Sequence, residues 1–295
     1  MKKTIGNPVS WSASVIGSAG RQIAHESRSI RGDPTAAIPE VRPIAISDLR
    51  DALRRGVADL ATFRSDVLFL ALVYPIIGLL LARMAFRLDL VHLIFPMVSG
   101  FALLGPIAAV VLYQMSRRRE LGLSTRWADG FAILRSPSLG PIVVLGAALF
   151  AAFLAWIYAA GLIYNITLGP AAPASVPTFL HEVFTTSQGW TMVVLGTCVG
   201  FVFSALVLVT SIVSFPLLVD RDVGVRVAVQ TSARMARCNP LATAVWGLIV
   251  ASSLVIGAVP MLLGLVIVVP VLGHATWHLY RRAVVQEPAQ SDKKS

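Results

Sequence analysis

Two histidines near the end of the chain have the spacing that comes closest to a chemical site. His274 and His278 are four residues apart, so a helix would place them on one face, and such a pair can bind a metal ion. The segment HATWH contains no Glu and no third ligand, which separates it from the zinc motif HExxH. The alternative is an interfacial aromatic belt or a helix-packing contact shared with Trp277 and Tyr280. The second interpretation is favoured, and we expect no bound metal and no cofactor.

A run of three arginines is the next candidate. Arg117, Arg118 and Arg119 lie in the segment SRRRE, directly after an apolar stretch. Such a run can contact anionic lipid headgroups or another anion. The alternative is a positive stop on the cytoplasmic side of a membrane span, which needs no ligand. Both interpretations stay open at this stage.

The usual catalytic and nucleotide-binding motifs are absent from the sequence. It contains no GxSxG, no P-loop and no GxGxxG, and no Ser, His and Asp can be placed at one depth in the predicted spans. Ion-coupled carriers usually keep a charged residue inside a span, but Asp66, Asp89 and Asp220 all fall at the ends of apolar stretches. The sequence therefore favours a protein that is not an enzyme.

The composition identifies the broad class. The chain has 295 residues, of which 56% are hydrophobic and only 14% are charged, whereas soluble domains carry about 25% charged residues. A soluble enzyme is therefore excluded. The net charge of +10 is explained by membrane topology, so we expect the lipid bilayer as a partner and no nucleic acid.

Apolar stretches predict an all-α, polytopic membrane helix bundle with six transmembrane helices. The final stretch is broken only by His274 and His278, and its forty residues would measure about 60 Å as a helix, twice the thickness of the hydrocarbon core. It is therefore predicted to form two spans joined by a tight turn near residues 257–260. The five stretches are residues 67–82, 90–113, 141–166, 189–219 and 241–280.

The distribution of positive charge predicts the orientation. Of the 25 Lys and Arg residues, all but Arg83 and Arg87 fall on the side that holds both chain ends. Lys and Arg collect on the cytoplasmic side, so both ends are predicted to be cytoplasmic, in a bacterial inner membrane. We expect disordered tails over residues 1–46 and 284–295, and a transmembrane domain over residues 47–283.

Three cytoplasmic segments have an amphipathic pattern. They cover residues 47–62, 125–135 and 222–237, and each comes before a predicted pair of spans. In the first, Leu49, Leu53, Val57 and Leu60 share a face, and Asp59 lies off it. One interpretation is a unit of interfacial helix and helix hairpin used three times. The alternative is that loops entering a membrane generally have this pattern.

Small residues in the fourth predicted span indicate close helix packing. Gly196, Gly200 and Ser204 are four residues apart, so another helix can approach this face. A pore lining is the weaker alternative.

Several stretches resemble a bacterial family of six-span integral membrane proteins of unknown function. They are SGFALLGP at residues 99–106, Asn-Pro with WGLIVA at 239–251, PVLGHATWHLYRR at 270–282 and ALRRGVADL at 52–60. Some members of that family are labelled as subunits of cytochrome c oxidase. The chain has three His in or near its spans, at two depths, so it cannot form a haem–copper centre alone. The resemblance implies the architecture and, at most, an accessory role beside a respiratory complex.

Together these features favour a non-enzymatic scaffold or accessory factor that packs against other membrane proteins or a second copy of itself. A small-molecule or lipid-handling transporter is the first alternative. A metal- or haem-binding accessory protein that uses His274 and His278 is the second.

Overall fold

The fold is helical throughout the residues that the computed structural model describes. These are residues 37–62, 72–87, 90–123 and 127–286. Within those ranges there is no β-strand, and the one extended pairing is an isolated antiparallel bridge between Val41 and Val284. The predicted span at 67–82 lies partly outside the described residues, as do most of the two predicted tails.

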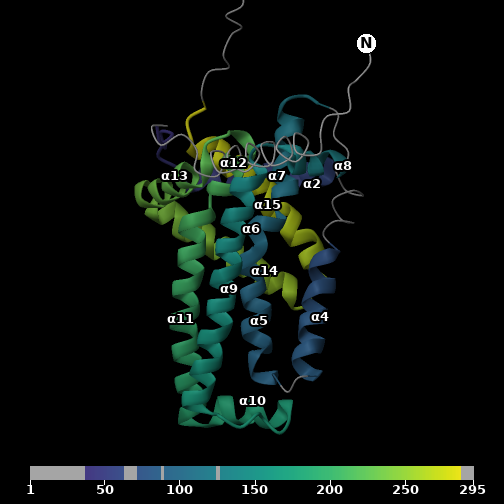
Figure 1. Cartoon of the computed structure of the whole chain (residues 1–295), viewed down its shortest axis with the longest axis vertical. Coiled ribbons are helices and arrows are strands. Elements are labelled where there is room, and N and C mark those ends of the chain that lie inside the picture. The colour runs from purple at the N-terminus through teal and green to yellow at the C-terminus, as the bar shows by residue number, and fades with distance from the viewer. Residues whose placement is uncertain (1–36, 63–71, 88–89, 124–126, 287–295) are drawn as a thin grey trace, which may run out of the picture.

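The long helices form a bundle that runs from a broad upper end to a narrow lower end (Figure 1). The sequence predicts six spans, and four described segments are long and apolar enough to cross a membrane: 91–120, 139–167, 187–220 and 240–258. The bundle consists of α4 (Val73–Arg87), a broken helix from η1 (Val91–Leu93) to α7 (Val110–Glu120), α9 (Leu139–Thr167), α11 (Ser187–Ser211), α14 (Pro240–Ala258) and α15 (Leu265–Ala283).

Prolines explain why the second of these helices is broken. Between η1 and α7 lie α5 (Ile94–Phe101), the 3-10 turn η2 (Ala102–Leu104) and α6 (Gly105–Ala108). Pro106 has no N–H to donate to the preceding turn, so the regular hydrogen-bond pattern stops there. The carbonyl of Pro96 accepts a hydrogen bond from Trp156 Nε1 of α9 at 2.9 Å. The indole thereby ties the bent helix to its neighbour.

The upper end carries a cap of helices that contains both described ends of the chain (Figure 1). It is built from α2 (Ile46–Thr62), α12 (Ser214–Asp220), α13 (Gly224–Cys238) and the ends of α7 and α15. The segments flanking α2 and α15 are hydrogen-bonded to each other, from Arg42 N to Ala283 O at 2.8 Å and from Val285 N to Glu40 O at 2.9 Å. The inner ends of both predicted tails thus belong to the cap, and the two described ends of the chain lie at the same end of the bundle.

Helix α2 lies directly against α15. Its buried residues are Leu49, Ala52, Gly56 and Asp59, which recur at helical spacing. A Cβ atom on Gly56 would lie 2.7 Å from both Ala275 N and Val271 O, so the two backbones approach closely there. An isolated 17-residue helix is barely stable in water, so this packing is what holds α2 in place.

The predicted interfacial helices differ in outcome. The segment 222–237 is confirmed as α13, with Arg226, Gln230, Arg234 and Arg237 on its exposed face. The described part of the segment 125–135 is not one amphipathic helix. It divides into α8 (Trp127–Gly130) and the 3-10 turn η3 (Phe131–Arg135). A Cβ atom on Gly130, the last residue of α8, would lie 2.5 Å from the Val111 side chain of α7. The threefold repeat therefore stays a prediction.

The opposite end carries a helix that the sequence interpretation missed. No helix is predicted between the apolar stretches 141–166 and 189–219, but α10 (Val176–Thr185) crosses the lower end of the bundle (Figure 1). Ser175 caps it by accepting a hydrogen bond from Thr178 N. Its exposed face carries Leu180 and Phe184, as expected of a helix that lies on a membrane surface.

Replacing Gly56 tests the contact between α2 and α15. We expect Gly56→Ala to destabilise the protein by about 1–3 kcal/mol, because the new methyl group meets backbone atoms that cannot move aside. Gly161→Ala in α9 is the matched control, since nothing lies within 4 Å of a Cβ there. The melting temperature in detergent measures both. A Gly56→Ala protein that melts at or above the temperature of Gly161→Ala would contradict the close approach.

Candidate functional site

A buried carboxylate lies at the centre of the cap. Asp59 of α2 is 4% exposed, and two other helices, α7 and α15, supply the groups around it. We call Asp59, Ser116, Arg119, His274 and His278 the Asp59 cluster. Ser116 and Arg119 come from α7, and both histidines come from α15. The structure therefore brings together the predicted histidine pair and one of the three predicted arginines.

The hydrogen bonds of the cluster form a chain. Ser116 Oγ donates to Asp59 Oδ2 at 2.6 Å and lies 2.7 Å from His274 Nδ1. His278 Nε2 lies 2.9 Å from the same carboxylate oxygen, and Arg119 Nη1 donates to Oδ1. An ionised carboxylate only accepts, so the Ser116 proton points to Asp59 and His274 Nδ1 carries the proton that it donates to Ser116.

The environment keeps Asp59 ionised. Burial raises the pKa of its carboxyl group, but hydrogen bonds from His278 and Ser116 and the positive charge that the two histidines can carry lower it by more. The net pKa lies below the usual value, so the carboxylate is negative at neutral pH. A buried negative charge without such donors would cost several kcal/mol.

The cluster corrects two sequence-based expectations. Asp59 was placed off the apolar face of its helix, whereas the structure buries it and leaves Val57 53% exposed. No Ser, His and Asp were expected at one depth, yet Ser116, His274 and Asp59 meet. The arrangement is still not a nucleophilic triad, because Ser116 donates to the carboxylate rather than to histidine and is only 1% exposed.

The arginine run faces inward. Arg117 Nε lies 3.3 Å from Asp220 Oδ1, Arg118 lies 3.6 Å from Asp129, and Arg119 contacts Asp59. Each arginine thus pairs with a carboxylate from a different part of the chain. These pairs already compensate the charges that lipid or another anion was predicted to contact, and that contact stays a prediction.

A second group of contacts ties α15 to the cap at Asp220 and Glu120. Tyr280 Oη donates to Asp220 Oδ2 at 2.6 Å, and Arg281 Nε donates to Glu120 Oε1 at 2.9 Å. Trp277 Nε1 donates to Glu120 Oε2 at 3.0 Å. The side chains of His274, Trp277 and Tyr280 are fully buried, so the predicted alternative of helix packing describes them and an aromatic belt facing lipid does not.

The remaining predicted residues lie elsewhere. His92 stacks on Tyr164 at the lower end, with ring centroids 4.0 Å apart, and is far from the histidine pair as expected. A Cβ on Gly200 would lie 3.1 Å from the Trp156 ring, so this glycine serves packing between α11 and α9. Gly196 has open space over it, and Ser204 is exposed.

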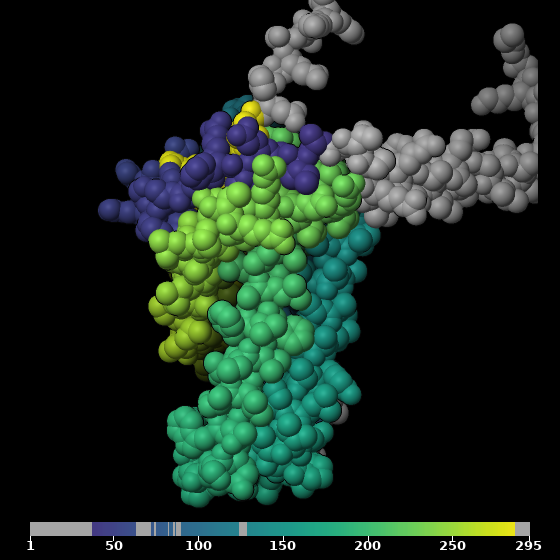
Figure 2. All heavy atoms as spheres, turned by 90° about the vertical axis from the view of Figure 1, so that its left-hand side faces the viewer, coloured from purple at the N-terminus to yellow at the C-terminus, as the bar shows by residue number. Residues whose placement is uncertain are grey.

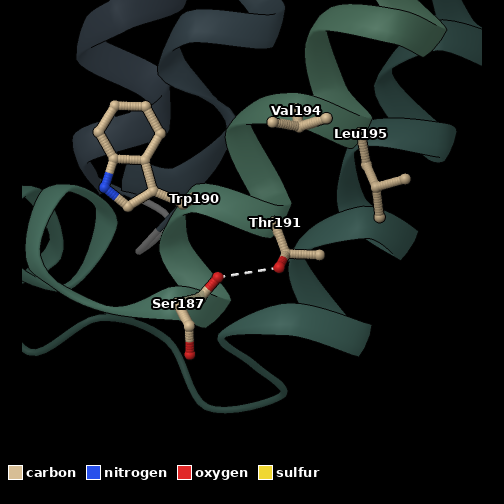
Figure 3. A pocket seen from close by; sticks show the side chains of 5 residues that line it. All are labelled: Ser187, Trp190, Thr191, Val194 and Leu195. Atoms are coloured by element: carbon tan, nitrogen blue, oxygen red, sulfur yellow. Dashed lines mark hydrogen bonds between the residues drawn. The ribbon is translucent and has the colours of Figure 1, made fainter.

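Two further features bear on ligands. Among the described residues, no group of three or more His, Cys, Asp and Glu side chains is arranged to hold a metal ion. A shallow hollow of about 390 Å³ lies at the lower end of α11 (Figure 3). It is lined by one face of that helix, with two hydroxyl groups beside three apolar side chains: Ser187, Trp190, Thr191, Val194 and Leu195.

The fold and the cap define an all-helical integral membrane protein with several apolar helices. Residues 94–220 match the family model described as predicted integral membrane protein (DUF2189), which agrees with the resemblance to a membrane family of unknown function. The matched segment contains the arginine run and Asp220, whereas Asp59, His274 and His278 lie outside it. No curated protein and no solved structure matches the chain.

Replacing the central carboxylate tests the cluster. We expect Asp59→Asn to destabilise the protein by about 3 kcal/mol, the lower end for breaking a buried ion pair, because Arg119 is partly exposed. Asp51→Asn is the control: its partner Arg282 lies 2.9 Å away, but the Asp51 side chain is 52% exposed and should contribute about 0–1 kcal/mol. The melting temperature in detergent measures both variants. An equal decrease in melting temperature for the two would contradict a larger contribution of Asp59 to stability.

Proposed function

We propose that this chain is a non-enzymatic scaffold or accessory factor of the bacterial inner membrane. Its six apolar helices are embedded in the membrane, and its cap and both chain ends face the cytoplasm. The distribution of Lys and Arg along the sequence supports this orientation, because all but Arg83 and Arg87 fall in segments predicted to lie on the side of the two chain ends. A scaffold needs a rigid frame and an exposed surface for partners.

The observation that carries the proposal is the inward direction of the cap's polar groups. Asp59 accepts hydrogen bonds from Ser116, His278 and Arg119, and Ser116 also bonds His274. These groups are hydrogen-bonded to one another, and three of the five are at most 4% exposed. A reaction centre needs groups that reach a substrate, whereas groups arranged in this way act as a brace between helices.

Helix α11 supplies the surface on which a partner would pack. It stands at the edge of the bundle and buries only Gly189, Val207 and Ser211 among its 25 residues. Phe201 and Val202 are 73% and 64% exposed. A membrane protein partner or a second copy would cover this face, and the open space over Gly196 would admit a helix closely.

Lipid handling is a second candidate, favoured by the hollow on α11. Its hydroxyl groups lie nearer the lower end of the bundle than its Val and Leu side chains (Figure 3). That order suits a phospholipid, with polar groups at the surface and acyl chains deeper. The hollow is open and lined by a single helix, so it fits a lipid held against the protein better than an enclosed transport path.

A photo-crosslinking amino acid at Phe201 tests the scaffold proposal in intact membranes. We expect a discrete product that joins the chain to one other membrane protein, or to a second copy, in about equal amounts. Ile166 of α9 is the matched control, since it is 74% exposed, and it should yield lipid adducts only.

The result at Phe201 separates the two candidates. Lipid adducts alone at both positions would contradict the scaffold proposal. Adducts with one phospholipid species at Phe201, and mixed lipids at Ile166, would favour lipid handling instead.

A further inference from the structure

The connection between α14 and α15 differs in composition from the connection between α9 and α11 at the lower end of the bundle. From Leu254 to Gly273 the sequence LVIGAVPMLLGLVIVVPVLG contains no polar side chain. The connection between α9 and α11, by contrast, contains Ser175, His181 and Glu182. A turn that reaches water usually carries such polar residues, so the α14–α15 turn has the composition of a segment that stays in lipid.

The depth of α15 supports the same conclusion. His274 and Ser116 are hydrogen-bonded at 2.7 Å, so they lie at one level. From His274 to its first residue, Leu265, α15 has nine residues and so extends about 14 Å, which is half of a hydrocarbon core of about 30 Å. The neighbouring helix has 24 residues between Ser116 and His92, or about 36 Å. The apolar stretch 241–280 predicts that α15 lies wholly in a membrane span, whereas the structure places its residues from His274 onward in the cap.

The contacts of the turn place it within the apolar layer. Leu262 packs on Gly78 in the middle of α4, and Leu262 and Leu265 form a cluster with Val98 and Phe101 of α5. Val98 is six residues, or about 9 Å, from His92 at the lower end of the bundle. Figures 1 and 2 agree, because the hairpin turns back before it reaches the level of α10.

The backbone of the turn is adapted to lipid. The N–H groups of Val259, Met261, Leu262 and Leu263 all donate to carbonyls within the hairpin, and Pro260 has no N–H. Met261 and Leu262 adopt φ angles of 50° and 66°, which closes the turn tightly. Irregular backbone survives at membrane depth only when its polar groups are satisfied within the protein.

We propose that α14 and α15 form a re-entrant hairpin, which enters the bilayer from the side of the cap and turns back inside the hydrocarbon. Its tip packs against acyl chains through Ile256, Val259, Met261 and Leu263, which are 60–79% exposed. On this proposal α14 turns back with α15 although residues 240–258 have the length of a span, so the chain crosses the membrane fully only before residue 220 and both ends lie on one side. This inference holds whether or not the chain is a scaffold.

Cysteine accessibility in the full-length protein tests the proposal. The native thiols Cys198 and Cys238 are exposed, so both are first replaced by Ser. Met261→Cys and Val259→Cys are then treated with a membrane-impermeant maleimide in right-side-out and inverted vesicles. Ala172→Cys in the α9–α11 connection and Ala58→Cys on α2 are exposed controls for the two sides.

We expect each control to be labelled from one side, and from opposite sides. The cysteines at 259 and 261 should be labelled less than a tenth as much from either side, and fully after the membrane is dissolved in denaturing detergent. Labelling of both from the side of Ala172→Cys would show a turn in the water beyond the membrane. Labelling from the side of Ala58→Cys would show a water-filled cavity open to the cap. Either result would overturn the proposal.

Discussion

The structure depends on the neutralisation of one buried charge. The Asp59 carboxylate can stay in the interior only because α7 and α15 supply hydrogen-bond donors to it from Ser116, Arg119 and His278. Those donors hold their geometry only while α2 lies across both helices. The carboxylate therefore fixes the position of α2, and α2 covers the cap end of α15 where Gly56 allows the two backbones to meet.

This constraint also sets the depth of the helices. Because Ser116 and His274 must meet at one level, the polar end of α15 belongs to the cap and only its first half is left for the bilayer. The arginine run lies at the same level, and its side chains pair with the carboxylates of Asp220, Asp129 and Asp59. One set of ion pairs thus lies at the level of the cap, where the proposed membrane placement puts the edge of the apolar layer.

Much of the fold could be predicted from the sequence because it follows from the cost of placing charge and unpaired backbone in lipid. Long apolar stretches became helices, the turn near residues 257–260 is observed at 259–264, and α13 presents its arginines outward as its periodicity indicates. Helix α10 was missed because the Ser, Pro and Thr residues at its start resemble a loop, although its apolar residues, among them Leu180 and Phe184, indicate a surface helix.

The site was only half predictable. The spacing of His274 and His278 correctly marked one helix face as special, but the residues that complete the cluster are distant in sequence. Asp59 could have been found from its spacing to Leu49, Ala52 and Gly56, which puts it on one helix face with small and apolar residues. Hydropathy alone placed Val57 on the buried face, because it scores small residues as nearly neutral and an aspartate as strongly polar. Close packing and paired hydrogen-bond donors decide burial here instead.

Hydrogen–deuterium exchange on the unmodified protein in lipid nanodiscs tests the central claim most directly. If Asp59 holds α2 as an integral part of the cap, the amides of residues 49–60 should exchange as slowly as those of residues 274–283 and open together with them. Exchange of the α2 amides at the rate of a free helix, while residues 274–283 stay protected, would contradict the account.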